Sequence, residues 1–270
     1  MTGELAQAIA LAAYGNAALA GDSAARRALT LDHDAFTVVI SVAFTRAGAA
    51  VATTPLAWFD HLRWRGARRL VLTRLARRTD WLPDHEAVAF AGGSGMMIAA
   101  DTRPAPELWA GEWRANFAAL HTHERRVWDV VYHAAEPPVP VHADEPPAAR
   151  YELQRAREAL GAALQASIAF AGPCTWTTGF FTPSLAMLTS AEVLVPARGL
   201  EHLPARGYGI AARRLLAAAT LAGSVFGGSG SWSDQDYGER QEAYREVSEG
   251  LFGATQTATL AAVNAFGAEG

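Results

Sequence analysis

The segment from His121 to Glu124 carries the residue types most typical of metal and acid–base chemistry. Histidine nitrogens and carboxylates are usual zinc ligands, and His121 and His123 stand two residues apart with Glu124 beside them. With a distant carboxylate such as Asp234, these side chains could serve a histidine- or metal-dependent hydrolase. Residues two apart converge on a strand or loop but point nearly opposite ways on a helix. We place these histidines at a helix C-terminus, where the dipole favours them, and expect neither a bound metal nor a cofactor.

A glycine-rich loop followed by a tryptophan is the second candidate, because backbone N–H groups before a helix can hold an anion. The residues of this candidate ligand-binding loop are Gly227, Gly228, Gly230, Trp232 and Asp234. The loop lacks the lysine of a P-loop and the third glycine of a dinucleotide-binding fingerprint. Its acidic residues would also repel a phosphate. We therefore predict a tight turn between two core helices, with the tryptophan buried in the core.

The stretch from Arg63 to Arg78 is the third candidate, because it holds seven arginines and no acid, with Trp64 among them. Arginines contact phosphates and an aromatic ring stacks on bases, so the stretch could bind a polyanion. The first arginines of the stretch are Arg63, Arg65, Arg68 and Arg69. On a strand, however, Arg69 and Arg74 would lie on opposite faces, and the chain has 27 acidic residues to pair with. We favour a solvated or ion-paired surface and do not expect nucleic-acid binding.

Three further features have residue types that could do chemistry. Aspartate beside histidine can tune a general base, as in Asp32-His33-Asp34 and in Asp84-His85-Glu86. Aspartate is also a common turn and capping residue, and we expect that role at both places. The one cysteine, Cys174, has no neighbour that would stabilise a thiolate. We expect it to be buried and inert.

Composition excludes several classes of function. All 23 basic residues are arginine, so Schiff-base catalysis, PLP attachment and a P-loop or kinase lysine are not possible with this chain. The net charge of −4 does not favour nucleic acid or an anionic membrane surface. A single cysteine suits a reducing, cytoplasmic compartment. We expect no signal peptide, and the longest nearly apolar run, 215–226, is too short to cross a membrane.

The first half of the chain mixes helical and strand patterns. Helices are expected over residues 4–20, from 22 or 23 to 29, from 55 to 66, and over 107–121. Strands are expected over residues 36–44, 49–53, 69–75, 86–91, 96–101 and 126–133, with a hairpin turn at 92–95. These patterns predict an α+β fold, with residues 1–136 forming a mixed unit around one small antiparallel sheet.

Five prolines between Glu136 and Pro147 mark the clearest boundary in the sequence. A connector of this composition runs extended over 137–147. Beyond it the apolar residues recur at helical spacing. Helices are expected up to 171 before Gly172, from Pro183, over 209–226, and from about Ser233 onward. Residues 148–270 are therefore predicted to form a helical bundle that packs on the first unit.

Several segments together resemble an uncharacterised family of bacterial proteins. In the second half these are the run from Val225 to Trp232, Tyr244, and the Ala-Ala-Val-Asn sequence at 261–264. In the first half they are Trp58-Phe59, the Arg-Arg-Leu-Val-Leu run at 68–72, and the Trp-Leu-Pro-Asp-His run at 81–85. The resemblance covers most of the chain, but its motifs are structural in type. It implies no activity and carries no catalytic residue to this sequence.

The sequence alone does not determine a reaction. The sequence has eight tryptophans and an alanine-rich core helix, and it shows no complete set of catalytic residues. Tryptophan is energetically strong in cores and at interfaces alike. The best interpretation is a cytoplasmic, non-enzymatic binding or interaction protein, either a homo-oligomer or one with a protein partner. A histidine- or metal-dependent hydrolase is the alternative, and polyanion binding through residues 63–78 is the third hypothesis.

Overall fold

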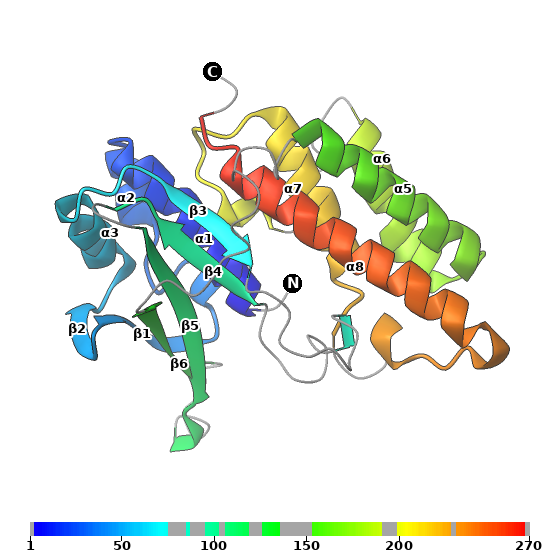
Figure 1. The fold of residues 1–270 in the computed structure, drawn as a ribbon, viewed down its shortest axis with the longest axis horizontal. Coiled ribbons are helices and arrows are strands. Elements are labelled where there is room, and N and C mark those ends of the chain that lie inside the picture. The colour runs from blue at the N-terminus through cyan, green and yellow to red at the C-terminus, as the bar shows by residue number, and fades with distance from the viewer. Residues whose placement is uncertain are drawn as a thin grey trace.

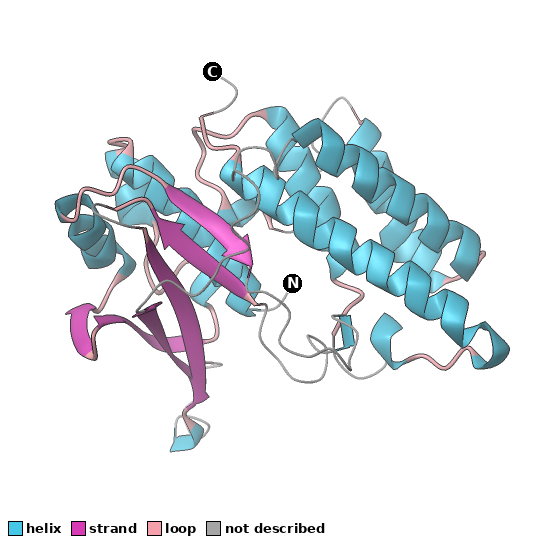
Figure 2. Ribbon diagram, in the orientation of Figure 1, coloured by secondary structure: helices cyan, strands magenta, loops and turns pink. Residues whose placement is uncertain are grey.

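The chain forms a sheet half and a helical half (Figure 1). The computed structural model describes residues 3–74, 85–86, 95–102, 106–118, 126–135, 153–190, 199–227 and 231–267. We call the described residues up to 135 the sheet half and those from 153 the helical half. All described strands belong to the first half, while the second is helical (Figure 2). The α+β class is confirmed. The proline-rich connector at 137–147 lies outside the described residues.

Three helices of the sheet half follow the capping signals of the sequence. Helix α1 is Gly3–Leu19, α2 is Ser23–Ala28 and α3 is Pro55–Trp64. The carboxylate of Asp22 accepts from two backbone N–H groups of α2, and Thr54 caps α3 with proline in its first turn. These helices agree with the prediction to within two residues at each end. Helices α1 and α3 pack against the sheet (Figure 1).

Six strands form one sheet in the order β2-β1-β6-β5-β4-β3. The strands are β1 (Val39–Arg46), β2 (Ala49–Ala52), β3 (Leu70–Arg74), β4 (Met96–Ala100), β5 (Glu107–Ala115) and β6 (Trp128–Ala135). Four neighbouring pairs are antiparallel, as expected, but β1 and β6 run parallel. The sheet is therefore mixed, because β6 inserts between β1 and β5 rather than joining an edge.

Strand β5 replaces the helix expected over 107–121. It pairs with β6 along nearly its whole length and with β4 over residues 107–110, so its first part is bonded within the sheet on both sides. Trp109 is completely buried against Phe44 and Trp58, at ring-centroid distances of 6.3 and 5.5 Å. Sheet pairing and this aromatic core outweigh local helix preference. Most of the strand expected at 86–91 and of the turn at 92–95 lies outside the described residues, and residue 86 itself is helical.

The helical half contains four α-helices among its described residues. They are α5 (Leu153–Ala171), α6 (Thr182–Thr189), α7 (Ile210–Gly223) and α8 (Gln241–Asn264). Helix α8 packs along both α5 and α7, as Figure 1 shows. It begins eight residues later than the sequence suggested, at Gln241 instead of Ser233. Two short 3-10 turns precede it, Trp232–Asp234 and Gly238–Arg240, and Gly238 at the start of the second has a positive φ of 54° that does not fit an α-helix.

The outer backbone of edge strand β3 is paired with two asparagine side chains, which we call the asparagine clips. Asn16 of α1 accepts from the Leu70 N–H at 2.7 Å and donates to the Leu70 carbonyl at 2.8 Å. Asn264, at the end of α8, makes the same two bonds to Leu72, both at 2.8 Å. A carboxamide offers one acceptor and a donor, as a peptide group does. The clips therefore close the edge as a neighbouring strand would, and the second joins the two halves.

Candidate functional site: a pocket between the halves

A pocket of about 330 Å³ lies where the sheet half meets the helical half. Its walls are α1, the 3-10 turn Asp34–Phe36, the 3-10 turn Leu200–His202 and α7. The lining residues are Gly3, Ala6, Asp34, Ala35, Thr37, Val38, Gly199, Glu201, His202, Thr220 and Ser224. This volume falls at the lower end of the range found for small-molecule sites. Because both halves supply walls, the pocket depends on how they pack.

His33 begins the first of these turns and links it to α1. Its Nδ1 accepts a hydrogen bond from the Ala35 N–H at 3.1 Å, which caps the turn. In the neutral ring the proton therefore sits on Nε2, 3.2 Å from the Tyr14 hydroxyl. Tyr14 in turn donates across the halves to the Glu201 carbonyl at 3.4 Å. This chain of contacts holds the two turns at a fixed distance.

His202 faces His33 from the helical half, with the two ring centroids 6.0 Å apart. Only 5% of its surface is exposed. Its Nε2 lies 3.6 Å from a carboxylate oxygen of Glu201, while its Nδ1 is buried without a hydrogen-bond partner among the described residues. Leaving a buried polar atom unpaired costs about 1–3 kcal/mol. Buried side-chain polar atoms usually have a partner, so this unpaired nitrogen beside the pocket marks His202 as a candidate for a functional role.

Burial determines the protonation of this cluster. Loss of solvent lowers the pKa of His33 and of His202 below the ordinary value of 6.5, against the opposing charges of Asp34 and Glu201. Burial also raises the pKa of Tyr14, so its hydroxyl keeps its proton. At neutral pH the histidines are uncharged. The ionised side chains of the described lining are then the two carboxylates.

Most residues predicted from the sequence do not meet at this pocket. His121, His123 and Glu124 lie outside the described residues. Within the described ranges no group of three or more histidine, cysteine, aspartate or glutamate side chains is arranged to hold a metal ion. Asp234, proposed as a distant partner for the histidines, belongs to the 3-10 turn Trp232–Asp234.

Trp232, which follows the glycine loop, is buried in the core, as the sequence predicted. The tryptophan is completely buried, with its ring edge-on to Phe181 at 5.2 Å. Its indole N–H donates to Ser248 at 2.8 Å, and its carbonyl accepts from the Tyr244 hydroxyl at 2.7 Å. Gly227 has a φ of 142°, while Gly228 and Gly230 lie outside the described residues. The tryptophan thus anchors the chain before α8.

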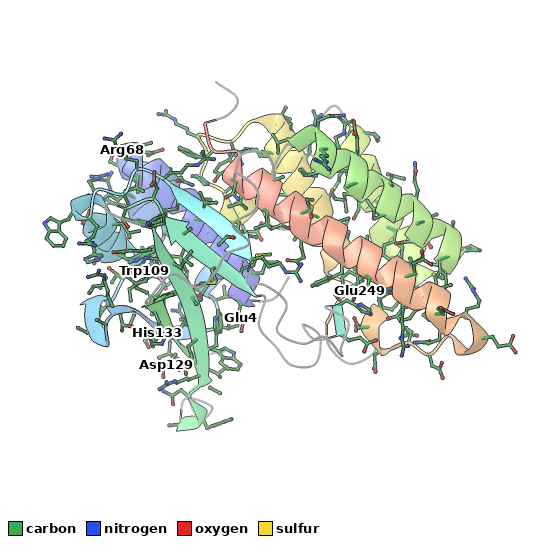
Figure 3. The ribbon with its side chains drawn as sticks, in the orientation of Figure 1. Glu4, Arg68, Trp109, Asp129, His133 and Glu249 are labelled. Atoms are coloured by element: carbon green, nitrogen blue, oxygen red, sulfur yellow. The ribbon has the colours of Figure 1, made fainter. Side chains whose placement is uncertain are left out.

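Three of the four arginines proposed for polyanion binding make contacts within the fold. Arg63 donates to the Ala18 carbonyl at the end of α1, and Arg65 pairs with Glu107 at 3.1 Å. Arg69 donates to the backbone carbonyl of Asn264 at 2.6 Å, across the halves. Arg68 is exposed (Figure 3). These arginines therefore bond the end of α1, the start of β5 and the junction of the halves more than they form one basic surface.

Among the described residues there are two other histidine clusters, one within the sheet half and one that joins the two halves. On the sheet, His133 lies between Thr45, at 2.8 Å from Nδ1, and Glu112, at 3.1 Å from Nε2. Completely buried His85 instead contacts Glu249 of α8, with Nδ1 2.5 Å from the carboxylate. Figure 3 shows His133 on a strand and Glu249 on the distant helix. Neither cluster contributes to the pocket.

The expectation for Cys174 is wrong in one respect, because the side chain is half-buried rather than fully buried. Partial burial raises the pKa of its thiol, but hydrogen bonds from Thr177 and from the backbone of Trp176 outweigh this and lower the pKa. The thiol is 3.8 Å from the Thr177 hydroxyl. No cation that would stabilise a thiolate further is seen beside it among the described residues.

Sequence reasoning missed most of the pocket. His33 and Asp34 were expected to have turn roles, which His33 does have as a cap, but Asp34 also lines the pocket. Tyr14, Glu201 and His202 carried no recognisable pattern. The one available signal was the short Leu-Glu-His-Leu segment at 200–203, which stands between two Pro-Ala-Arg-Gly sequences.

Comparison with protein-family models, with curated proteins and with solved structures found no significant match. Among the described helices, none has the length and apolar character needed to span a membrane. The functional inference therefore depends on the geometry of the pocket.

Proposed function

We propose that the protein is a non-enzymatic binding protein that holds a small molecule in the pocket between its halves. The observation that carries this proposal is a pocket of about 330 Å³ that both halves line, beside the almost completely buried His202, whose Nδ1 has no hydrogen-bond partner among the described residues. Polar groups from both halves surround it, as is usual for ligand sites. A ligand that bridges these walls would be held by the sheet half and the helical half together.

The pocket supports binding better than catalysis. A nucleophile needs a hydrogen-bonded base that removes its proton. The Tyr14 hydroxyl has a raised pKa and donates to a backbone carbonyl, and the Ser224 hydroxyl donates to the Leu221 carbonyl at 2.6 Å. His33 turns its protonated Nε2 toward Tyr14, so the neutral ring cannot take a proton from that hydroxyl. Substrate turnover at this site is therefore not part of the proposal.

A thermal-shift screen of a small-molecule library tests the proposal. Compounds that raise the unfolding temperature are then measured on Thr37→Trp, which fills the pocket from its exposed rim, and on Thr53→Trp, the same change on an exposed threonine outside the lining. We expect pocket ligands to lose their effect on the first variant and to keep it on the second. A library without any stabilising compound, or compounds that stabilise both variants equally, would contradict the proposal.

Hydrolysis is the second candidate function, and the row Thr45–His133–Glu112 is the observation that favours it. Its order of hydroxyl, imidazole and carboxylate is that of nucleophilic catalysis. It ranks second because the His133 and Glu112 side chains are almost half exposed, at 47% and 46%, so solvent weakens their interaction.

A fluorophosphonate probe tests this second candidate. If the row is active, the Thr45 oxygen attacks phosphorus, fluoride leaves and His133 takes the hydroxyl proton. The expected product is a covalent adduct on the native protein and on Thr53→Val, but not on Thr45→Val. Absence of an adduct on the native protein would exclude hydrolysis by this row.

A further inference from the structure

We propose that the ligand of the pocket is a small organic cation that donates N–H hydrogen bonds, such as a protonated amine or a guanidine. This inference rests on the proposed function. It goes further by assigning the chemical class of the ligand from the charges and hydrogen-bonding atoms of the walls.

The charge of the walls is the first argument. Asp34 from the sheet half and Glu201 from the helical half are the acidic side chains of the described lining, both are exposed to solvent, and no arginine is among the lining residues. The Asp34 carboxylate has no hydrogen-bond or ion-pair partner within the described residues. A cation placed between the two acids would be attracted from both sides, whereas an anion would be repelled from both.

The hydrogen-bonding atoms of the walls are the second, independent argument. His202 is neutral, and a proton on its Nε2 faces the Glu201 carboxylate at 3.6 Å. Its buried Nδ1 is then an acceptor without a donor. The Ser224 hydroxyl donates its hydrogen bond to the Leu221 carbonyl, so toward the pocket it can act only as an acceptor. The walls therefore supply acceptors and require a ligand that supplies donors.

Other ligand classes satisfy these walls less well. A neutral polyol would donate hydrogen bonds but would leave two carboxylates without a counter-charge. A bound metal ion needs several convergent ligands, and the described residues contain no group of three that could hold one. An organic ammonium or guanidinium group matches both the charge and the donors.

The same groups give binding a defined pH dependence. The charged groups that act on His33 and His202 are Asp34 on its turn, Glu201 on the opposite turn and the N-terminal amine of the chain, and Arg213 on α7 acts on the neighbouring Tyr14. Protonation of either histidine adds positive charge beside the cation. Affinity should therefore rise as pH increases from about 5 to 7.5, through the titration of the two imidazoles.

Isothermal titration calorimetry with four probes tests the inference. Putrescine and agmatine are the cations, and 1,4-butanediol and succinate are the neutral and anionic molecules of the same carbon chain. We expect the cations alone to bind. Asp34→Asn and Glu201→Gln, which remove charge but keep shape, should each weaken binding about three- to tenfold. Asp32→Asn is the matched control, because Asp32 pairs with Arg126 outside the pocket lining. It should leave binding unchanged, and circular dichroism checks the fold of each variant.

The results distinguish failure of the cation inference from failure of the pocket as a binding site. If succinate or butanediol binds, is blocked by Thr37→Trp, and the cations do not bind, the cation inference is overturned while the pocket function stands. If the cations bind but neither carboxylate variant weakens them, the inference is likewise overturned. If none of the four probes binds, the cation inference fails, and the library screen then decides separately whether the pocket binds any ligand.

Discussion

At the scale of single residues, Asn264 joins the two halves by completing an edge strand. Its carboxamide bonds both backbone groups of Leu72, and its own carbonyl accepts from Arg69. All of these atoms except part of the arginine are buried. The residue thus has the role that a strand would have at an ordinary sheet edge. In the sequence, Asn264 looks like an ordinary polar residue at the end of a helix, and nothing indicates its role at the sheet edge.

Replacing Asn264 with alanine should lower the free energy of unfolding by about 2–4 kcal/mol, because the N–H and C=O of Leu72 lose their partners in a buried setting. Urea denaturation measures this. Asn116→Ala is the control: its amide makes one part-buried bond to Asp129 at 2.9 Å, so its loss should cost about 1 kcal/mol or less. An equal loss of unfolding free energy in the two variants would show that the Asn264 clip contributes no more than an ordinary part-buried hydrogen bond.

Three histidines make stability depend on pH. Burial lowers the pKa of His33, His61 and His202 in the folded chain below the value of 6.5 expected when unfolded. The unfolded state therefore binds more protons, and stability should fall as pH decreases from about 6.5 toward 5. Urea titrations at several pH values measure the slope. His202→Gln should flatten it, whereas exposed His133→Gln should not; a slope unchanged in His202→Gln contradicts the assignment.

At the scale of elements, close packing of α1 on β3 decides what residue 15 can be. A Cβ at Gly15 would lie 2.3 Å from a methyl group of Leu70 and 3.0 Å from the Phe59 ring. Leu70 is completely buried, so that methyl has no free space to enter. Helix propensity would favour alanine here by about 1 kcal/mol, but overpacking costs about 1–3 kcal/mol. The steric effect is the larger one.

We expect Gly15→Ala to destabilise the protein by about 1 kcal/mol or more. Gly250→Ala in α8 is the matched control, since nothing lies within 4 Å of its added Cβ. That change should stabilise by up to about 1 kcal/mol. Thermal or urea unfolding of both variants gives the comparison, and a stabilised Gly15→Ala protein would mean that α1 can move away from β3.

The predictable elements are those in which the local sequence pattern favours the same structure that the packing in the fold stabilises. Helix α3 begins at a threonine cap followed by proline, and β6 alternates Trp128, Val130 and Tyr132 toward the core. Strand β5 was not predictable, because Trp109 and Trp113 share a face in both a helix and a strand. The pocket was not predictable either: Glu201 and His202 follow His33 by about 170 residues, and only the fold brings them together.

At the scale of the whole molecule, the contacts between the halves are specific as well as apolar. Asn264 bonds Leu72, Tyr14 bonds the Glu201 carbonyl, and Arg69 donates to the Asn264 carbonyl at 2.6 Å. Buried hydrogen bonds of this kind hold two units in one arrangement. The pocket therefore keeps its shape only while the halves remain together.

Hydrogen exchange followed by mass spectrometry should show the halves unfolding as one unit. Peptides covering β3 and α8 are expected to share the same opening free energy in the native protein, because each needs the other for its buried bonds. Asn264→Ala should separate the two values, with β3 opening first. Different opening energies in the native protein would mean that the halves fold independently.

The two asparagine clips become available at different times during synthesis of the chain. Asn264 is added to the growing chain 192 residues after Leu72, whereas Asn16 precedes Leu70. At about 5–20 residues per second, the Leu72 backbone waits about 10–40 s for its partner. During synthesis the sheet thus carries a half-open edge, available to another emerging chain. The order in which the ribosome makes the two asparagines sets how long that exposure lasts.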